Sequence, residues 1–379
     1  MNRLAMAIAA ALSVSPVFAQ VPPFSVAPGL FDTTRPDDLG LKPASGTQSY
    51  TVFRASEGTD HYVNGVVLIG YRDRLYAQWQ SSAKDEDAAD THVVYAVSND
   101  AAHWSSPMRL GPDDGIVRTS GGWWTDGKTL TAYINVWNTD FRSGGTTQAV
   151  TSQDGVHWSE SRSATDASGK PVVGVIEQDP HALPDGRVVT AFHLQPGLIA
   201  TPFYTDDPKG LTGWTAGKMP HLPHQGLESR ELEPSWFRRA DGCLVMVFRD
   251  QESTFRQLAS VSCDRGETWT MPVVTAMPDS RMKQSAGNLP DGTAYLVHAP
   301  SGNKLRSPLA LTLSKDGKLF DRAFLLRAGP PPPVRFEGLY KRPGYHYPKS
   351  VVWNGALWIG YANAKEDVVI VRVPLAGLH

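Results

Sequence analysis

The chain has 379 residues, and its 36 Lys and Arg residues nearly balance its 38 Asp and Glu residues, leaving a net charge of −2. This balance excludes a general nucleic-acid-binding protein, because such proteins need a basic surface to displace counterions from phosphates. With 20% charged and 41% hydrophobic residues the chain is not disordered, and its 34 Gly and 29 Pro residues indicate many tight turns. The length exceeds the roughly 100–200 residues of an ordinary domain, which favours two domains or one large, repetitive all-β fold.

The first nineteen residues have the pattern of a secretory signal peptide. Arg3 gives a short basic start, an apolar run extends from Leu4 to Val14, and Val17-Phe18-Ala19 precedes a cleavage point near Ala19. The apolar run is shorter than the roughly 20 residues that span a bilayer, and no later segment approaches that length. We therefore expect a secreted or periplasmic protein without a membrane-spanning segment.

Hairpin turns recur along the rest of the chain. Asp-Gly and Asn-Gly between β-branched or aromatic runs favour tight hairpins, because the type I′ turn needs positive φ. The turns lie at Arg72-Asp73, Asp126-Gly127, Asp185-Gly186, Asp241-Gly242, Asp291-Gly292 and Asn354-Gly355. The spacing between the five glycines is 59, 56, 50 and 63 residues, which predicts one repeated structural unit.

A second motif follows most of these turns. In it an Asp accepts backbone N–H bonds, a Gly takes positive φ, and an aromatic residue packs back on the sheet. Copies lie at 98–104, 152–158 and 262–269, with a degraded copy at 314–320 and a weaker one at 205–214. Repeats of this length with four strands each indicate a β-propeller. We predict an all-β, six-bladed propeller of four-stranded antiparallel blades as one domain over 46–379, preceded by an extension over 20–45.

The two cysteines lie at the ends of neighbouring predicted strands. Cys243 opens the apolar run 243–248, and Cys263 follows the run 258–262. If these strands pair antiparallel, the two ends face each other and a disulfide is geometrically possible, and export to an oxidising compartment is compatible with it. Two free buried thiols are the alternative.

The second motif is the Asp box, or BNR repeat, and nearly the whole mature chain resembles the sialidase (neuraminidase) superfamily. The resemblance implies a glycoside hydrolase whose partner is a glycan with a terminal acidic sugar. The sequence has no phosphate-binding Gly loop, no Gly-x-Ser-x-Gly motif and no clustered His ligands. We therefore expect neither a cofactor nor a metal.

The segment 233–250 is similar to the sialidase stretch in which a Glu opens one strand and an Arg closes the next. By this resemblance Glu233 is the general base, and Arg249 and Arg306 clamp the substrate carboxylate, as an Arg fork suits a carboxylate. Tyr347, ahead of the last hairpin, is the nucleophile, with Tyr345 and His346 as competitors for that role. A neutral Tyr suits an anomeric carbon that bears a carboxylate, since a carboxylate nucleophile would be repelled.

The first blade departs from the sialidase pattern. Where sialidases have an Arg-Ile-Pro-like motif, this chain reads Asp60-His61-Tyr62, and Arg54 lies off the motif. Twenty-four residues after His61, Asp85 opens an acidic triplet and is the expected general acid. Tyr62, His346 and Lys349 are expected to contact the substrate beside it.

His61 raises an alternative activity. Its position is similar to that of the catalytic His in some propeller polysaccharide lyases, and in a related rhamnosidase group acting on rhamnose–glucuronate linkages. There His61 and Tyr347 would act as base and acid, while an Arg neutralises the uronate carboxylate. A structural role for His61 and a catalytically silent, glycan- or protein-binding propeller are further alternatives.

Overall fold

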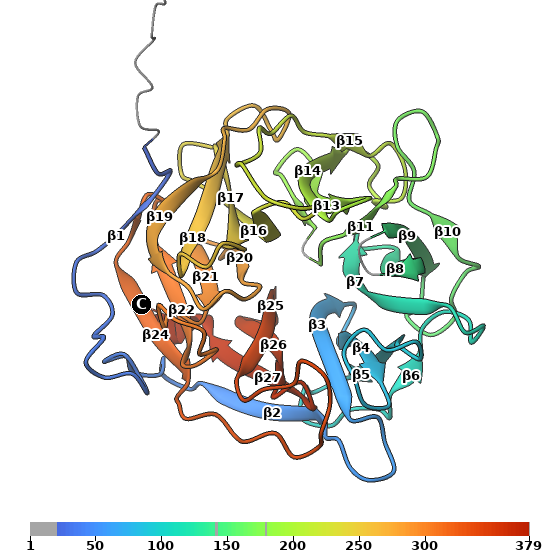
Figure 1. Cartoon of the computed structure of the whole chain (residues 1–379), viewed down its shortest axis with the longest axis horizontal. Helices are drawn as coiled ribbons and strands as arrows, with labels where there is room; N and C mark the ends of the chain where they lie inside the picture. The colour runs from blue at the N-terminus through green and yellow to red at the C-terminus, as the bar shows by residue number, and fades with distance from the viewer. Residues whose placement is uncertain (1–20, 141–142, 179, 379) are drawn as a thin grey trace, which may run out of the picture.

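The computed structural model describes residues 21–140, 143–178 and 180–378, and these form a six-bladed β-propeller (Figure 1). The predicted signal peptide lies outside the described residues. Figure 1 looks down the ring, with the first strand of each blade nearest the centre and the later strands successively farther out. The predicted fold class is therefore confirmed.

The first three blades follow one another in chain order. Blade 1 contains β3 (Tyr62–Tyr71), β4 (Arg74–Ser82), β5 (His92–Ser98) and β6 (Met108–Arg109). Blade 2 contains β7 (Val117–Thr125), β8 (Leu130–Asp140), β9 (Ser143–Ser152) and β10 (Arg162–Ser163). Blade 3 contains β11 (Gly174–Ile176), β12 (His181–Ala182), β13 (Val188–Leu194), β14 (Ile199–Thr205) and β15 (Thr215–Ala216). Its innermost position is split, because β11 and β12 both pair with β13.

The second half of the ring has the same plan. Blade 4 contains β16 (Glu231–Arg238), β17 (Leu244–Asp250), β18 (Arg256–Ser262) and β19 (Val273–Pro278). Blade 5 contains β20 (Ser285–Asn288), β21 (Ala294–His298), β22 (Leu309–Ser314) and β24 (Arg322–Arg327). Blade 6 contains β25 (Tyr345–Trp353), β26 (Ala356–Asn363) and β27 (Asp367–Pro374), and a 3-10 turn, η1 (Leu375–Leu378), follows.

The ring is closed by the N-terminal part of the chain. Strand β2 (Gln48–Phe53) pairs antiparallel with β27 and forms the outermost strand of blade 6, so this blade joins both ends of the domain (Figure 1). Farther upstream, β1 (Ser25–Val26) pairs in parallel with β23 (Leu319–Phe320). This closure leaves few free strand edges, which is how propellers avoid edge-to-edge association.

Six apolar clusters lie between the neighbouring blades and hold the ring together. Strand β17 illustrates the pattern, because its side chains alternate between two neighbours. Leu244, Met246 and Phe248 pack in the cluster shared with blade 3, whereas Val245 and Val247 pack in the cluster shared with blade 5. Both faces of the blade are therefore buried, which explains why the strand reads as a continuous apolar run.

The turns lie at the predicted positions, but among them only Asn354-Gly355 has positive φ at both residues, as a type I′ turn needs; in the four Asp-Gly turns only the glycine does. Each predicted hairpin joins the first strand of a blade to the next, and the Asp boxes follow the third strands of blades 1 to 5. In the first box, Asp100 Oδ1 accepts the backbone N–H groups of Ala102 and His103 at 2.9 and 2.8 Å. The indole of Trp104 donates to the carbonyl of Ala101 at 3.0 Å, so the box is a self-contained turn.

The open question about the cysteines is resolved: Cys243 and Cys263 form a disulfide between the facing ends of two strands in blade 4. Within the described residues, no helix has the length and apolar character needed to cross a membrane.

Candidate active site

The innermost strands of four blades are interrupted at one level of the central channel. The pairing register shifts between Asn64 and Val67, Ser120 and Gly122, Leu232 and Ser235, and His346 and Lys349. At these bulges blades 1 and 2 have Gly65 and Gly122, with φ of 62° and 87°, as bulges often require. Blades 4 and 6 have Glu233 and Tyr347, both with φ of 53°. A non-glycine residue in this region costs about 1–3 kcal/mol, and such strain concentrates at functional sites.

Both strained residues face one cavity of about 350 Å³. Its charged lining comes from several blades and includes Glu177, Glu233, Arg249 and Lys283, with Tyr347 beside them. Trp137, Val175 and Leu198 add apolar wall on the side of blades 2 and 3. A concave site with a few converging polar groups and apolar walls is the usual form of a small-molecule site.

Tyr347 and Glu233 meet at a single nitrogen. Arg249 Nη1 donates to Glu233 Oε2 at 2.9 Å and to Tyr347 Oη at 3.3 Å, while Nη2 donates to Gln251 Oε1 at 2.7 Å. The Glu233 and Arg249 side chains are only 15% and 14% exposed. The predicted base, nucleophile and first clamp residue are therefore brought together.

The charges around this pair keep the acid ionised and the phenol neutral. Burial raises the pKa of Glu233, but the charges of Arg249 and Lys283 outweigh it and hold the pKa below the usual carboxyl value. Burial and the charge of Glu233 raise the pKa of Tyr347, against the opposite effect of Arg306 and Arg249. Glu233 is therefore available to accept a proton from a phenol that does not lose it unaided.

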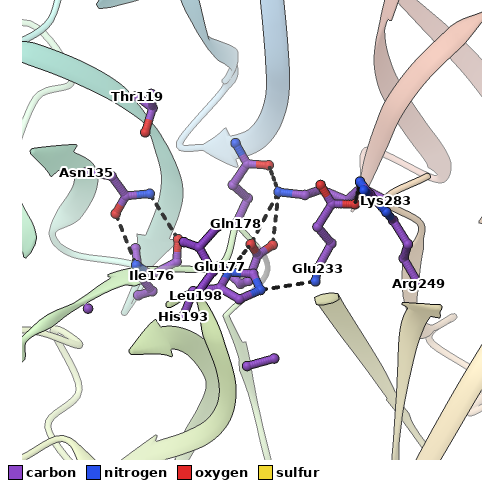
Figure 2. A network of polar contacts seen from close by, with 12 residues as sticks. Thr119, Asn135, Ile176, Glu177, Gln178, His193, Leu198, Glu233, Arg249 and Lys283 are labelled. Carbon is purple, nitrogen blue, oxygen red and sulfur yellow. Dashed lines mark hydrogen bonds and ion pairs between the residues drawn. The ribbon is translucent and has the colours of Figure 1, made fainter. Parts of the chain in front are cut away.

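Three further cations lie over the ring of Tyr347. The guanidinium carbon of Arg306 is 5.0 Å from the ring centroid, and the Nζ atoms of Lys283 and Lys365 are at 5.6 and 5.8 Å. Lys283 Nζ is also 3.0 Å from Glu177 Oε2 and 3.0 Å from Gln178 Oε1 (Figure 2). With Arg249, four cationic side chains therefore surround the nucleophile candidate.

His346 lies behind Arg306. Its Nδ1 accepts a hydrogen bond from Arg306 Nη1 at 2.8 Å, and its Nε2 donates to the carbonyl of Arg342 at 3.0 Å. Burial and the charges of Arg306 and Lys365 hold the pKa of His346 well below its usual value, so the imidazole is a neutral acceptor. His346 orients the predicted clamp residue.

Lys365 comes from the turn between β26 and β27, and its Nζ forms an ion pair with Glu86. Glu86 Oε1 also accepts from the buried Tyr62 hydroxyl at 3.0 Å. Burial lowers the pKa of Lys365 to about 8, with Glu86 opposing this shift and Arg306 adding to it. A lysine from blade 6 therefore supplies positive charge beside Tyr62, where the sequence lacks the first-blade arginine.

Of the nine predicted site residues, Glu233, Arg249 and Tyr347 line the cavity and the other six do not. Arg306, His346 and Tyr62 make the contacts described above. His61 stacks on Phe336 at 3.9 Å between ring centroids, and its Nε2 bonds to the carbonyl of Ser56. Asp85 Oδ1 accepts the backbone N–H of Leu339 at 2.8 Å. Lys349 is fully buried and donates to the carbonyl of Gln284 at 3.2 Å. From the acidic triplet, Asp87 lines the cavity.

The sequence reasoning missed Glu177, Lys283 and Lys365. The first two could have been found from their distance to the hairpin turns. Glu233 lies eight residues before Asp241 of its turn, and the same distance separates Glu177 from Asp185 and Lys283 from Asp291. This position is where the innermost strand meets the channel. Lys365 has no such signal, because its partner Glu86 lies 279 residues away in the chain. Among the described residues, no group of three or more His, Cys, Asp or Glu side chains is arranged to hold a metal ion.

Residues 73–359 match the family described as BNR repeat-like domain, which is most of the chain. The chain belongs to this family. Comparison with curated protein sequences gives no match.

Several solved structures of similar fold are sialidases, and one, from Dyadobacter fermentans, is described as a protein of unknown function. A structure described as "Sialidase" aligns with a TM-score of 0.67 and 18% identity, over 93% of this chain but only 35% of its own. Hadza microbial sialidase Hz136 aligns with a TM-score of 0.68 and 16% identity, over 87% of this chain and 69% of its own. Trypanosoma rangeli sialidase in complex with sialic acid aligns with a TM-score of 0.64 and 14% identity, over 89% and 60%. The BNR repeat-like protein is therefore a sialidase-like propeller, and at these identities the likeness concerns the fold.

Proposed function

We propose that the BNR repeat-like protein is an exo-glycosidase that hydrolyses a terminal acidic sugar from a glycan. The observation that carries the proposal is the shared nitrogen of Arg249, which holds Glu233 Oε2 at 2.9 Å and Tyr347 Oη at 3.3 Å in one cavity. An ionised carboxylate next to a neutral phenol is the arrangement that nucleophilic catalysis by tyrosine requires.

In the first step the Tyr347 oxygen forms a bond to the anomeric carbon and the glycosidic C–O bond breaks. The phenolic proton passes to Glu233, and an acid on the loop 85–87 protonates the leaving oxygen. Water then attacks the anomeric carbon and gives a proton to that loop carboxylate. The bond between the sugar and the Tyr347 oxygen breaks, and Tyr347 recovers its proton from Glu233. Asp87, which lines the cavity, is better placed for the loop acid than Asp85.

The cations that surround Tyr347 would hold the carboxylate of the sugar. Arg306 supports this role, because it donates hydrogen bonds to the neutral His346 and to the carbonyl of Arg281, so an incoming carboxylate would give it a direct counter-charge. The mutual repulsion within the cluster points the same way: burial lowers the pKa of Arg281, and the charges of Arg249 and Arg306 lower it further. An anion would relieve this repulsion.

The test compares substrates on the purified chain. Methylumbelliferyl N-acetylneuraminide and methylumbelliferyl glucuronide report hydrolysis, and the ultraviolet absorbance of an unsaturated uronate reports the lyase reaction. Tyr347→Phe and Glu233→Gln should each lower kcat by about 100-fold or more. Tyr345→Phe is the matched control. It removes a hydroxyl group from the same strand, but this hydroxyl donates to the carbonyl of Ala328 and not into the cavity. Unchanged hydrolysis in both site variants would contradict the proposal.

No specific observation favours the lyase alternative, since His61 stacks on Phe336 away from the residues that line the cavity. Export remains part of the proposal. The Cys243–Cys263 disulfide supports it, because disulfides persist in oxidising compartments. N-terminal sequencing of the protein recovered from outside the cytoplasm would test cleavage near Ala19.

A further inference from the structure

His193 links blade 3 to the strained backbone of Glu233. It lies on the second strand of blade 3, β13, where it pairs with Val175 of the innermost strand β11, and it lines the cavity. Its Nε2 accepts the backbone N–H of Glu233 at 3.1 Å (Figure 2). This is the residue that adopts a φ of 53° within the bulge of β16.

The protonation state of His193 follows from its partners. A backbone N–H can only donate, so Nε2 carries no proton in this contact. Nδ1 lies 3.0 Å from Glu177 Oε1 and therefore donates its proton to that carboxylate. Both side chains are nearly inaccessible, at 6% and 7% exposure. The imidazole is neutral, and Glu177 fixes the tautomer in which Nε2 is free to accept.

Glu177 is in turn fixed by a second contact. Lys283 Nζ lies 3.0 Å from Glu177 Oε2 and reaches Gln178 Oε1 at 3.0 Å (Figure 2). Burial raises the pKa of Glu177, but the charge of Lys283 and the hydrogen bond of His193 outweigh it and keep the carboxylate ionised. The charged groups that face His193 are therefore Glu177, Lys283 and Glu233, with Lys349 acting on Glu177 from blade 6.

We propose that His193 is a positioning residue that holds the Glu233 backbone in its catalytic conformation by accepting its N–H at Nε2. The proposal rests on the proposed function of Glu233. Without an acceptor at this position the hydrogen bond is lost and the left-handed conformation loses its support. Glu233 would then leave the position in which it shares Arg249 with Tyr347.

Two variants separate the acceptor from the imidazole ring. His193→Gln places an amide oxygen near the position of Nε2, whereas His193→Leu has no acceptor. His298→Leu is the control for loss of a buried histidine, because His298 bonds to Thr312 Oγ1 at 2.9 Å in blade 5. Circular dichroism of each variant checks that the propeller is retained.

The first readout does not depend on activity. Residue-resolved hydrogen–deuterium exchange of the Glu233 amide should accelerate about tenfold in His193→Leu and stay near the wild-type rate in His193→Gln and His298→Leu. If His193→Leu fails to fold, His193→Phe keeps an aromatic ring without an acceptor and provides the same comparison with His193→Gln. Equal protection in all folded proteins would overturn the proposal.

The second readout is the steady-state kinetics of methylumbelliferyl N-acetylneuraminide hydrolysis. His193→Leu should lower kcat about 100-fold with a much smaller change in KM, because a misplaced catalytic group affects the chemical step. His193→Gln should recover most of this loss. An equal loss of kcat in His193→Leu and His193→Gln would overturn the proposal. If the wild type cleaves none of the tested glycosides but the exchange result is as expected, the proposed function is wrong. The role of His193 in holding the Glu233 backbone then still stands.

Discussion

The carboxyl group of Asp279 lies in the segment between β19 and β20, where the charges of Arg249 and Arg306 act on it. It should make the stability of the protein depend on pH. It is 1% exposed. Its Oδ2 accepts the backbone N–H of Arg281 at 2.9 Å, and its Oδ1 has no hydrogen-bond partner among the described residues. Burial raises the pKa of Asp279 to about 7, although backbone hydrogen bonds and the charges of Arg249 and Arg306 oppose this shift.

The sign of the effect follows from the two pKa values. The folded-state pKa lies above the ordinary 3.8, so the folded protein holds this proton more tightly than the unfolded chain. The contribution of Asp279 to stability is therefore fully present below about pH 4 and is lost as pH rises to about 7. At about 1.4 kcal/mol per unit, the two units between pH 5 and pH 7 correspond to a loss of about 3 kcal/mol.

Asp279→Asn removes the ionisation while keeping an acceptor oxygen for Arg281. Urea unfolding of both proteins at pH 5 and pH 8 should show the variant gaining about 3 kcal/mol relative to the wild type, which is about 4 °C in Tm for a domain of this size. Asp250→Asn is the matched control. Burial raises the pKa of Asp250, but hydrogen bonds from Arg230 and Thr254 outweigh it and keep the pKa low. This control should be destabilising by a similar amount at both pH values. A difference between Asp279→Asn and the wild type that does not change with pH would refute the reasoning.

Three more outcomes follow from the geometry. Lys365→Met should raise KM for the acidic sugar about tenfold. The wild-type KM should also rise above about pH 8 as Lys365 loses its proton, whereas the KM of Lys365→Arg should not change with pH in this range. Steady-state kinetics across pH measures both effects. Replacing Cys243 and Cys263 by Ser should cost about 3 kcal/mol, because the disulfide closes a loop with a sequence separation of 20, and urea unfolding with and without reductant measures this. Glu233→Gly should be about 1 kcal/mol more stable than Glu233→Ala, since both lose the carboxylate but only Ala is strained at a φ of 53°; the reverse order would be expected of an ordinary strand position.

The sequence predicts the blades because their signals are local. A hairpin turn and an Asp box each lie within a few residues, and Asp100 meets its acceptor requirements within three positions. Strand β2 has no such signal, because its pairing with β27 joins residues more than 300 positions apart, such as Gln48 and Arg372. The ring closure could therefore be inferred only from the fold class as a whole.

The candidate site divides in the same way. Glu233, Arg249 and Tyr347 stand next to recognisable turns, and the structure brings them together. His193 has no motif, because its role depends on a partner 40 residues away in the neighbouring blade. The conformation of the first-blade loop decides which carboxylate of its triplet lines the cavity, and that conformation is set by contacts such as the one between Asp85 and the backbone of Leu339.

The charge balance around the nucleophile candidate indicates what kind of sugar fits. Four cations surround Tyr347 within about 6 Å, and three of them have a carboxylate partner: Arg249 with Glu233, Lys283 with Glu177, and Lys365 with Glu86.

The fourth cation, Arg306, contacts the neutral His346 instead. A monoanionic sugar would give this guanidinium a direct carboxylate partner. The methyl ester of the same sugar would leave it without one, which costs more than the lost attraction alone. Binding of the free acid and its methyl ester should therefore differ by at least tenfold in Kd, and equal affinities would mean that the arginine does not recognise a carboxylate.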